Sequence, residues 1–244
     1  MYNADAQRWV AVAFGANTKD LQIAISDTDN ALGPWKSTKF EGYAGLGGSI
    51  TVADYPTLAR DKHAVYIGTN DFANTPTSST VSFRGTTLNV IPLDSLFNAA
   101  APTTANLKQF VTPNTVDRGF ALQGVNSSSA ASSGTVVATA LGPFDSLAFK
   151  VNGLTSSSAV ASTITNPIFL GEAAYFAPGA ARQPAVSNPA NRRIYYVKTV
   201  NSAADGLDEA RVRYTVLDAQ TLSILDQGDI GQAGPEFMIL NSLK

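Results

Sequence analysis

The sequence contains no cysteine and a single histidine, His63. Without cysteine, disulfide bridges and zinc or iron–sulfur sites built on thiolates are excluded, and one histidine leaves few other ways to hold a transition metal. Charged residues are also scarce, at 15% of the chain, and the net charge is -2 at pH 7. Because a nucleic-acid backbone requires clustered lysine and arginine, this composition argues against nucleic-acid binding.

Long apolar runs are missing as well. No segment approaches the roughly 20 apolar residues that a membrane-spanning helix needs, so no membrane span is expected. Residues 1–5 have neither the basic start nor the apolar stretch of a signal peptide. The low charge and the many Ser, Thr, Asn and Gly residues are nevertheless typical of secreted bacterial proteins. We therefore expect an extracellular or cell-surface location, which requires that a leader segment has preceded residue 1.

Paired apolar segments are abundant. Four times an apolar strand pattern is followed by a second one, at a period of roughly 50 to 70 residues, and no helical periodicity of comparable strength accompanies them. The pairs comprise residues 10–14 and 21–26, 64–69 and 88–91, 135–141 and 146–151, and 194–199 and 211–217.

This repetition predicts an all-β fold, and within that class a β-propeller of four-stranded antiparallel blades. We expect one domain with about four blades and less than about a tenth of the residues in helix. Six aromatic side chains are expected to be buried between the sheets: Trp9, Phe14, Tyr66, Phe149, Tyr196 and Tyr214. The expected blade units are residues 8–53, 54–115, 116–181 and 182–233, and residues 234–244 start a further blade or close the ring.

The first and last units are expected to be incomplete. Residues 8–14, 21–25 and 35–40 give the first blade three strands, without an innermost one. Residues 237–240 have the pattern of an inner strand with no blade of its own. This strand either closes the ring beside residues 10–14 or begins a further blade, and the second alternative is favoured because four blades are the lower limit of the fold. Since open sheet edges attract partners, self-association is expected.

Motifs spread over nearly the whole chain form a further pattern. They are RWVAV at residues 8–12, AISDTDN at 24–30, DYPTL at 54–58, AVYIGTN at 64–70, RYTVL at 213–217 and LDQGDI at 225–230. Together they resemble the secreted bacterial multi-bladed propeller proteins that are loosely called sialidase-like. The resemblance implies the fold more firmly than an activity. In that family further strands flank the matching segments, which implies that this chain is a fragment of a larger propeller.

Three residues are candidates for ligand binding. Overlaying the inner-strand repeats places Asp54, Arg118 and Arg182 at equivalent positions, at the mouth of the expected channel. Guanidinium groups bind carboxylate or sulfate through paired, charge-assisted hydrogen bonds, and the resemblance adds that sialidases hold their substrate's carboxylate with arginines. The alternative, which we favour, is that Arg118 pairs with Asp117 or Asp54 and only solvates the channel rim.

Catalytic signatures are weak. His63 lies in a polar turn and is interpreted as a solvated turn residue, since no Gly-x-Ser-x-Gly elbow supports a catalytic triad. The glycine-rich residues 45–49 lack the lysine of a phosphate-binding loop and are interpreted as a flexible connection. A glycosidase needs only two suitably placed carboxylates, and the candidates are Asp54, Asp61, Asp117 and Glu172.

A polar loop offers a second interpretation, as a metal site. Asp27, Asp29 and Asn30 carry oxygen ligands suited to Ca²⁺, but Thr38 stands where a calcium loop has its bidentate Glu. A polar turn that caps its own backbone amides is the favoured interpretation. No other cofactor is expected.

Two functions follow from these patterns. The favoured one is a non-catalytic extracellular propeller that serves as a binding or structural module of a surface or secreted protein, with a glycan or another protein as its ligand. The alternative is a sialidase-like or other glycan-processing hydrolase. The two differ in whether a pocket holds two carboxylates at the separation that glycoside hydrolysis requires.

Overall fold

The computed structural model describes residues 1–15, 19–43, 50–74, 81–97, 101–113, 119–128, 133–140, 144–172, 185–188, 192–201 and 210–230. Among these described residues the fold is all-β, with 64% strand and 3% helix, which confirms the expected low helix content there. Among the described residues, one short helix, α1 (Leu93–Phe97), interrupts the strands. No helix in this part of the chain is long and apolar enough to cross a membrane.

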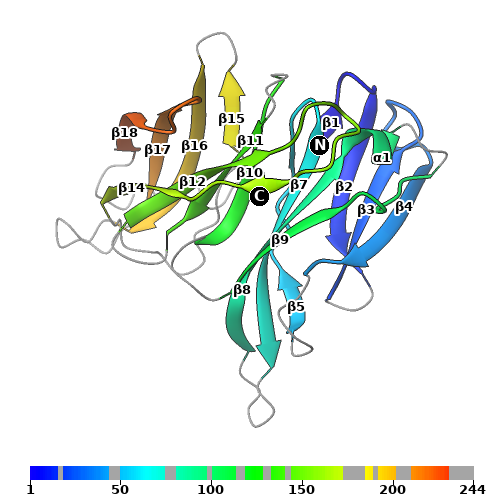
Figure 1. Cartoon of the computed structure of the whole chain (residues 1–244), viewed down its shortest axis with the longest axis horizontal. Coiled ribbons are helices and arrows are strands. Elements are labelled where there is room, and N and C mark those ends of the chain that lie inside the picture. Colours follow the sequence, from blue (N-terminus) through cyan, green and yellow to red (C-terminus); the bar gives the residue numbers. More distant parts are fainter. Residues whose placement is uncertain are drawn as a thin grey trace.

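The first sheet, which we call sheet 1, is an antiparallel meander. Its strands are β1 (Tyr2–Asn3), β2 (Arg8–Phe14), β3 (Asp20–Ser26) and β4 (Trp35–Glu41), in that spatial order (Figure 1). The expectation that this unit lacks an innermost strand is therefore wrong. Tyr2 lies opposite Trp9, and their ring centroids are 5.1 Å apart. Because β1 has only two residues, it is too short to produce a periodic pattern in the sequence.

Sheet 2 is organised around its longest strands. It consists of β5 (Ile50–Asp54), β6 (Ala59–Arg60), β7 (Ala64–Asn74), β8 (Val81–Pro92) and β9 (Lys108–Pro113). Strand β8 lies between β7 and β9, and β5 and β6 both pair with β7. The two residues of β6 pair with Val65 and Tyr66, near the start of β7. We call β6 the inner strand of sheet 2.

Sheets 3 and 4 are joined through their inner strands. Sheet 3 comprises β10 (Phe120–Asn126), β11 (Ser133–Thr139), β12 (Phe144–Asn152), β13 (Thr163–Ile164) and β14 (Ile168–Glu172). Sheet 4 comprises β15 (Ala185–Asn188), β16 (Arg193–Asn201), β17 (Ala210–Asp218) and β18 (Ile224–Ile230). Strands β10 and β15 run parallel and are hydrogen-bonded, so the inner strands of two neighbouring sheets lie side by side.

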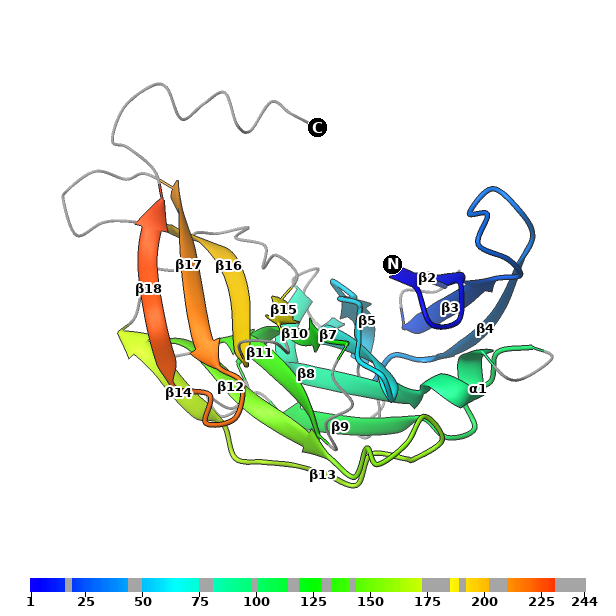
Figure 2. The same cartoon turned by 90° about the horizontal axis from the view of Figure 1, so that it is seen from above.

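The four sheets pack face to face in series, and Figure 2 shows them in an open arc. Successive residues of a strand point to opposite faces, so Val65 and Ile67 pack against sheet 1, whereas Ala64 and Tyr66 pack against sheet 3. Val137 of sheet 3 packs in turn against sheet 4. A two-sheet sandwich would bury one face of each sheet. Here the two middle sheets bury both faces.

The predicted burial of the aromatic side chains is confirmed in part. Tyr66, Phe149 and Tyr196 are at most 2% exposed and lie in the cores between sheets. Trp9 and Tyr214 are half-buried. The prediction for Phe14 is wrong, because it is the last residue of β2 and is 42% exposed at the end of the sheet.

Candidate functional site

The innermost strands of the four sheets meet in one region. Tyr2 of β1, Arg60 of β6, Asn126 of β10 and Ser187 of β15 line the same hollow, whose volume is about 330 Å³. The Arg60 backbone amide donates to Asn126 Oδ1 at 3.0 Å, and the Ser127 amide donates to the Arg60 carbonyl oxygen at 3.0 Å. These bonds hold the inner strands of sheets 2 and 3 together at the centre of the arc.

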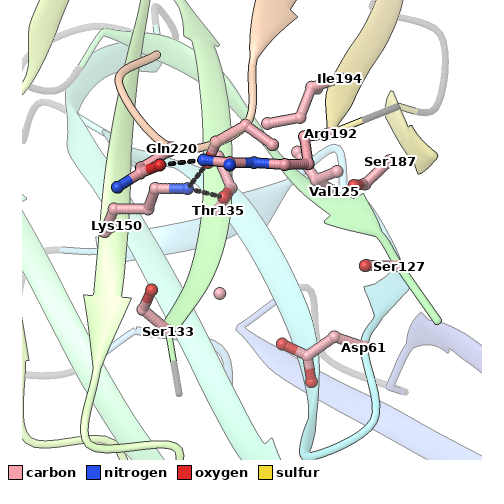
Figure 3. A pocket seen from close by; sticks show the side chains of 12 residues that line it. Asp61, Val125, Ser127, Ser133, Thr135, Lys150, Ser187, Arg192, Ile194 and Gln220 are labelled. Atoms are coloured by element: carbon pink, nitrogen blue, oxygen red, sulfur yellow. Dashed lines mark hydrogen bonds between the residues drawn. The ribbon is translucent and has the colours of Figure 1, made fainter. Parts of the chain in front are cut away.

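A second hollow adjoins this one and shares Ser127 and Ser187 with it. We call it the central pocket; its volume is about 320 Å³, and sheets 2, 3 and 4 all contribute to it. Four of its lining side chains carry hydroxyls, and the other polar ones are two cations, one carboxylate and one amide (Figure 3). The lining residues are Asp61, Val125, Ser127, Ser133, Gly134, Thr135, Lys150, Ser187, Arg192, Ile194, Ala219 and Gln220.

Lys150 is the more enclosed of the two cations. It lies on β12 directly opposite Thr135 of β11, and its Nζ donates to Thr135 Oγ1 at 2.8 Å and to the Ala219 carbonyl oxygen at 2.5 Å. Burial lowers the pKa of the Lys150 amine to about 8, although the negative charge of Asp218 opposes this shift. An ammonium has three N–H donors, so one remains for a ligand beside these two bonds.

Arg192 reaches the pocket from the turn before β16, and its guanidinium donates to Gln220 Oε1. Gln220 is held in place by Asp218, whose Oδ1 accepts the backbone amides of Gln220 at 2.8 Å and Thr221 at 2.7 Å. These amide bonds, more than the nearby Arg192 charge, lower the pKa of Asp218. The self-capped turn therefore positions Ala219 and Gln220 as the partners of both cations.

Asp61 lies at the other end of the pocket from the two cations (Figure 3). It is 4% exposed, and its Oδ1 accepts the backbone amides of His63 at 2.7 Å and Ala64 at 2.9 Å. Its Oδ2 accepts the hydroxyl of Tyr66. With three donors already bound, this carboxylate stabilises the turn between β6 and β7, and one lone pair of Oδ2 remains for a ligand.

His63 is buried, so the interpretation as a solvated turn residue is wrong. It is 9% exposed, and neither ring nitrogen has a hydrogen-bond partner in the described part of the chain. The start of α1 lies against this turn, since the Leu93 amide donates to the His63 carbonyl oxygen at 2.9 Å. The next amide, of Asp94, bonds to Ser157 at 2.9 Å, so a distant segment also packs here. His63 does not line the central pocket.

The residues expected to bind an anion are not brought together by what the structure describes. Asp54 is exposed at the end of β5, and its Oδ1 accepts the amide of Tyr55 at 2.8 Å. It is not among the residues that line the central pocket. Arg118 and Arg182 lie outside the described residues, so the predicted ring of arginines stays a prediction.

The other candidates have mixed outcomes. Asp117 and residues 45–49 lie outside the described residues, and Glu172 contributes its backbone to the pairing of β14 with Phe144 of β12.

The turn with the candidate Ca²⁺ ligands Asp27, Asp29 and Asn30 caps its own backbone amides. Thr28 Oγ1 accepts the Asn30 amide at 3.2 Å, and Asn30 Oδ1 accepts the Leu32 amide at 3.0 Å. Within the described ranges, no group of three or more His, Asp or Glu residues is placed to hold a metal ion.

Sequence reasoning missed the two cations of the central pocket. Lys150 interrupts an otherwise apolar strand, between Phe149 and Val151, and this was the one signal that could have marked it. Arg192 precedes a strand and carries no signal of its own, because its role depends on a turn that is distant in sequence.

Comparison with known proteins gives no relative from which a function can be transferred. No model of a protein family matches the sequence, and no curated protein matches it. The resemblance to sialidase-like propellers therefore stays an expectation, and a function has to be inferred from the site itself.

Proposed function

We propose that the chain is a non-catalytic, extracellular binding module of the β-propeller type, and that its central pocket binds a glycan. One observation carries this proposal: two cations and four hydroxyl-bearing residues line a pocket of about 320 Å³ where the inner strands meet. A volume of this size lies at the lower end of the range for small-molecule sites. It would admit a single sugar unit.

The propeller interpretation has two supports beyond the repeats. Each of the four sheets contributes its innermost strand or the residues beside it to the centre of the arc. The sheets also stack face to face, with β10 and β15 running parallel next to each other. Sheets that radiate from a common centre, each with one strand at that centre, are the defining geometry of a propeller. Residues 237–240, the proposed closing strand or start of a further blade, lie outside the described residues.

The chemistry of the lining favours an acidic sugar. Lys150 and Arg192 would bind a carboxylate or sulfate by charge-assisted hydrogen bonds, and the hydroxyls of Ser133 and Thr135 suit sugar hydroxyls, which both donate and accept. Asp61, at the opposite end, has acceptor capacity for one further hydroxyl. The pocket would therefore orient its ligand with the acid group toward Lys150.

Binding is favoured over hydrolysis because of the carboxylates. A glycosidase places two of them on either side of the scissile bond. Asp61 is the one carboxylate among the residues that line this pocket, and two backbone amides and a tyrosine hydroxyl already bind it. A sialidase-like hydrolase is the alternative function, and hydrolysis of a glycan would distinguish it from a binding module.

Binding should depend on Lys150 and on pH. A screen of the whole chain against neutral, carboxylated and sulfated glycans should identify an acidic ligand, followed by calorimetric titration of the best one. We expect Lys150→Gln and Arg192→Gln each to weaken this binding about tenfold to a hundredfold, because each removes a hydrogen bond to a charged group. Binding should also weaken as the pH rises through about 8, where the Lys150 amine loses its charge.

The matched control is Lys36→Gln, which neutralises a lysine in an exposed ion pair with Asp27 on sheet 1, where the N–O distance is 3.4 Å. It should bind as the parent chain does. Failure of all acidic glycans to bind would contradict the proposal. Hydrolysis of any glycan that disappears in Asp54→Ala or Glu172→Ala would overturn it in favour of the glycosidase.

A further inference from the structure

The amine of Lys150 has only neutral partners, although the side chain is half-buried. Its Nζ donates to Thr135 Oγ1 at 2.8 Å and to the Ala219 carbonyl oxygen at 2.5 Å. It forms no ion pair with any carboxylate in the part of the chain that the structure describes. Because neither bond supplies a negative charge, burial favours the uncharged form of this amine.

An uncharged Lys150 amine would be ready to react. It has two N–H groups and one lone pair, and with both N–H groups donated to Thr135 and Ala219 the lone pair takes the remaining tetrahedral direction. All three residues line the central pocket, so a ligand in the pocket meets this lone pair. Burial lowers the pKa of the amine to about 8, which leaves roughly a tenth of it uncharged at pH 7. Desolvated lysines of this kind form imines with carbonyl compounds.

A second cation selects the kind of carbonyl compound. Arg192 and Lys150 point toward each other at one end of the pocket (Figure 3). Their partners are neighbours in the chain, since Lys150 bonds to the carbonyl oxygen of Ala219 and Arg192 to the side chain of Gln220. A guanidinium carries five N–H donors, so others remain for a carboxylate. A ligand that suits both side chains has an acid group next to an electrophilic carbonyl carbon.

We propose that Lys150 is a covalent attachment site for a small α-oxo acid, whose carbonyl carbon joins the Lys150 amine as an imine while Arg192 binds its carboxylate. In an α-oxo acid these two carbons are directly bonded, which matches the adjacent placement of the two side chains. The amine nitrogen bonds to the carbonyl carbon, and the carbonyl oxygen leaves as water with the two amine protons. No oxidant or reductant is required. This attachment goes beyond glycan binding in the same pocket and does not depend on it.

Reductive trapping tests for the imine. The whole chain is incubated with pyruvate and cyanoborohydride at about pH 8, so that hydride adds to the imine carbon and makes the attachment permanent. Peptide mass spectrometry then gives the rate at which each lysine is labelled. Lys150 should be labelled about tenfold faster than Lys36, because about half of its amine is uncharged at this pH, against less than about 1% of an ordinary lysine.

Lys36 is the matched control within the same chain. Its side chain is 53% exposed and forms an ion pair with Asp27. Access alone would therefore favour Lys36 over the half-buried Lys150. A faster reaction at Lys150 has to come from its environment in the pocket.

Two variants separate the roles of the two cations. Lys150→Arg keeps a positive charge but cannot form an imine, so it should lose the fast-labelled site while Lys36 reacts as in the parent. Arg192→Gln should slow the labelling of Lys150 by pyruvate about tenfold, since the carboxylate loses a charge-assisted hydrogen bond. The same variant should leave labelling of Lys150 by acetaldehyde unchanged, because this carbonyl compound has no acid group.

Labelling of Lys150 no faster than that of Lys36 would overturn the proposal. Equal slowing of pyruvate and acetaldehyde in Arg192→Gln would overturn the assignment of the carboxylate to Arg192. The two lysines are compared within the parent chain, so the test holds even if Lys150→Arg does not fold. Pyruvate takes the place of the glycans in this experiment, so a failure of trapping and a failure of glycan binding are separate results.

Discussion

Gly134→Ala is expected to destabilise the chain by about 3 kcal/mol or more, at the upper end of the usual cost of overpacking a core. A Cβ at this position would lie 2.5 Å from Tyr66 Cζ and closer still to the hydroxyl oxygen. Tyr66 cannot retreat easily, since it is 0% exposed and its hydroxyl donates to Asp61 Oδ2. For a domain of this size, such a loss lowers the melting temperature by roughly 6–12 °C.

Calorimetric unfolding of the variant and the parent gives this difference directly. Gly33→Ala is the matched control, because its Cβ would meet nothing nearer than Asn30 O at 3.2 Å in an exposed turn. If the clash with Tyr66 is the cause, the double variant Gly134→Ala, Tyr66→Leu should lose less than the sum of the two single variants. Strict additivity would contradict the explanation, as would a melting temperature within a degree of the parent's.

The strand pairs could be predicted from the sequence because buried sheet faces leave apolar patterns in it. Each of the four expected pairs contains an observed antiparallel hairpin: β2 with β3, β7 with β8, β11 with β12, and β16 with β17. In the middle sheets both faces are buried, so the strands are apolar along most of their length, as in Ala64 to Ile67. Such runs are recognisable even where strict alternation is absent.

The short strands could not be predicted, for a physical reason. β1, β6 and β13 have two residues each, and backbone bonds to a neighbouring strand hold them rather than a pattern of their own. Met1 illustrates this, since its amine donates to the Val10 carbonyl oxygen at 2.8 Å. Local sequence carries no record of such a pairing.

The central pocket could not be predicted from the sequence either. Asp61, Lys150 and Arg192 come from three different sheets, and only the stacking of those sheets brings them to one cavity. An overlay of the repeats selects Asp54 instead, on the assumption that equivalent positions face the channel. The exposed side chain of Asp54 accepts the amide of its neighbour Tyr55. Asp54 ends β5, which pairs with β7 alongside the short β6, so it does not lie on the strand that the repeats make equivalent.

A buried carboxylate should make the stability of the chain depend on pH. Asp71 of β7 is 0% exposed; its Oδ1 accepts the Thr69 hydroxyl at 2.9 Å, and its Oδ2 accepts the Thr87 hydroxyl at 2.5 Å. Burial raises the pKa of Asp71 to about 6, although both hydroxyl bonds oppose the shift. The nearby Tyr43 is affected by the same carboxylate, because burial and then the charges of Glu41, Asp71 and Asp20 raise its pKa.

The direction of this pH dependence follows from a comparison of the folded with the unfolded chain. In the unfolded chain Asp71 has its usual pKa of 3.8, so the folded chain holds this proton up to a higher pH than the unfolded chain does. Its contribution to stability is therefore present in full below pH 3.8 and is lost as the pH rises through 6. The whole difference between the two pKa values corresponds to roughly 3 kcal/mol, of which about 2 kcal/mol falls between pH 4.5 and pH 7.5.

Asp71→Asn isolates this contribution from that of the other carboxylates. An asparagine is neutral at every pH, and its amide can accept from one threonine hydroxyl and donate to the other. Denaturant unfolding at pH 4.5 and pH 7.5 should show the parent losing about 2 kcal/mol relative to the variant as the pH rises. Thr87→Val should enlarge the pH dependence of the parent, because it removes a donor that favours the ionised form. Parallel pH profiles of parent and Asp71→Asn would show that Asp71 ionises in the folded chain without this cost.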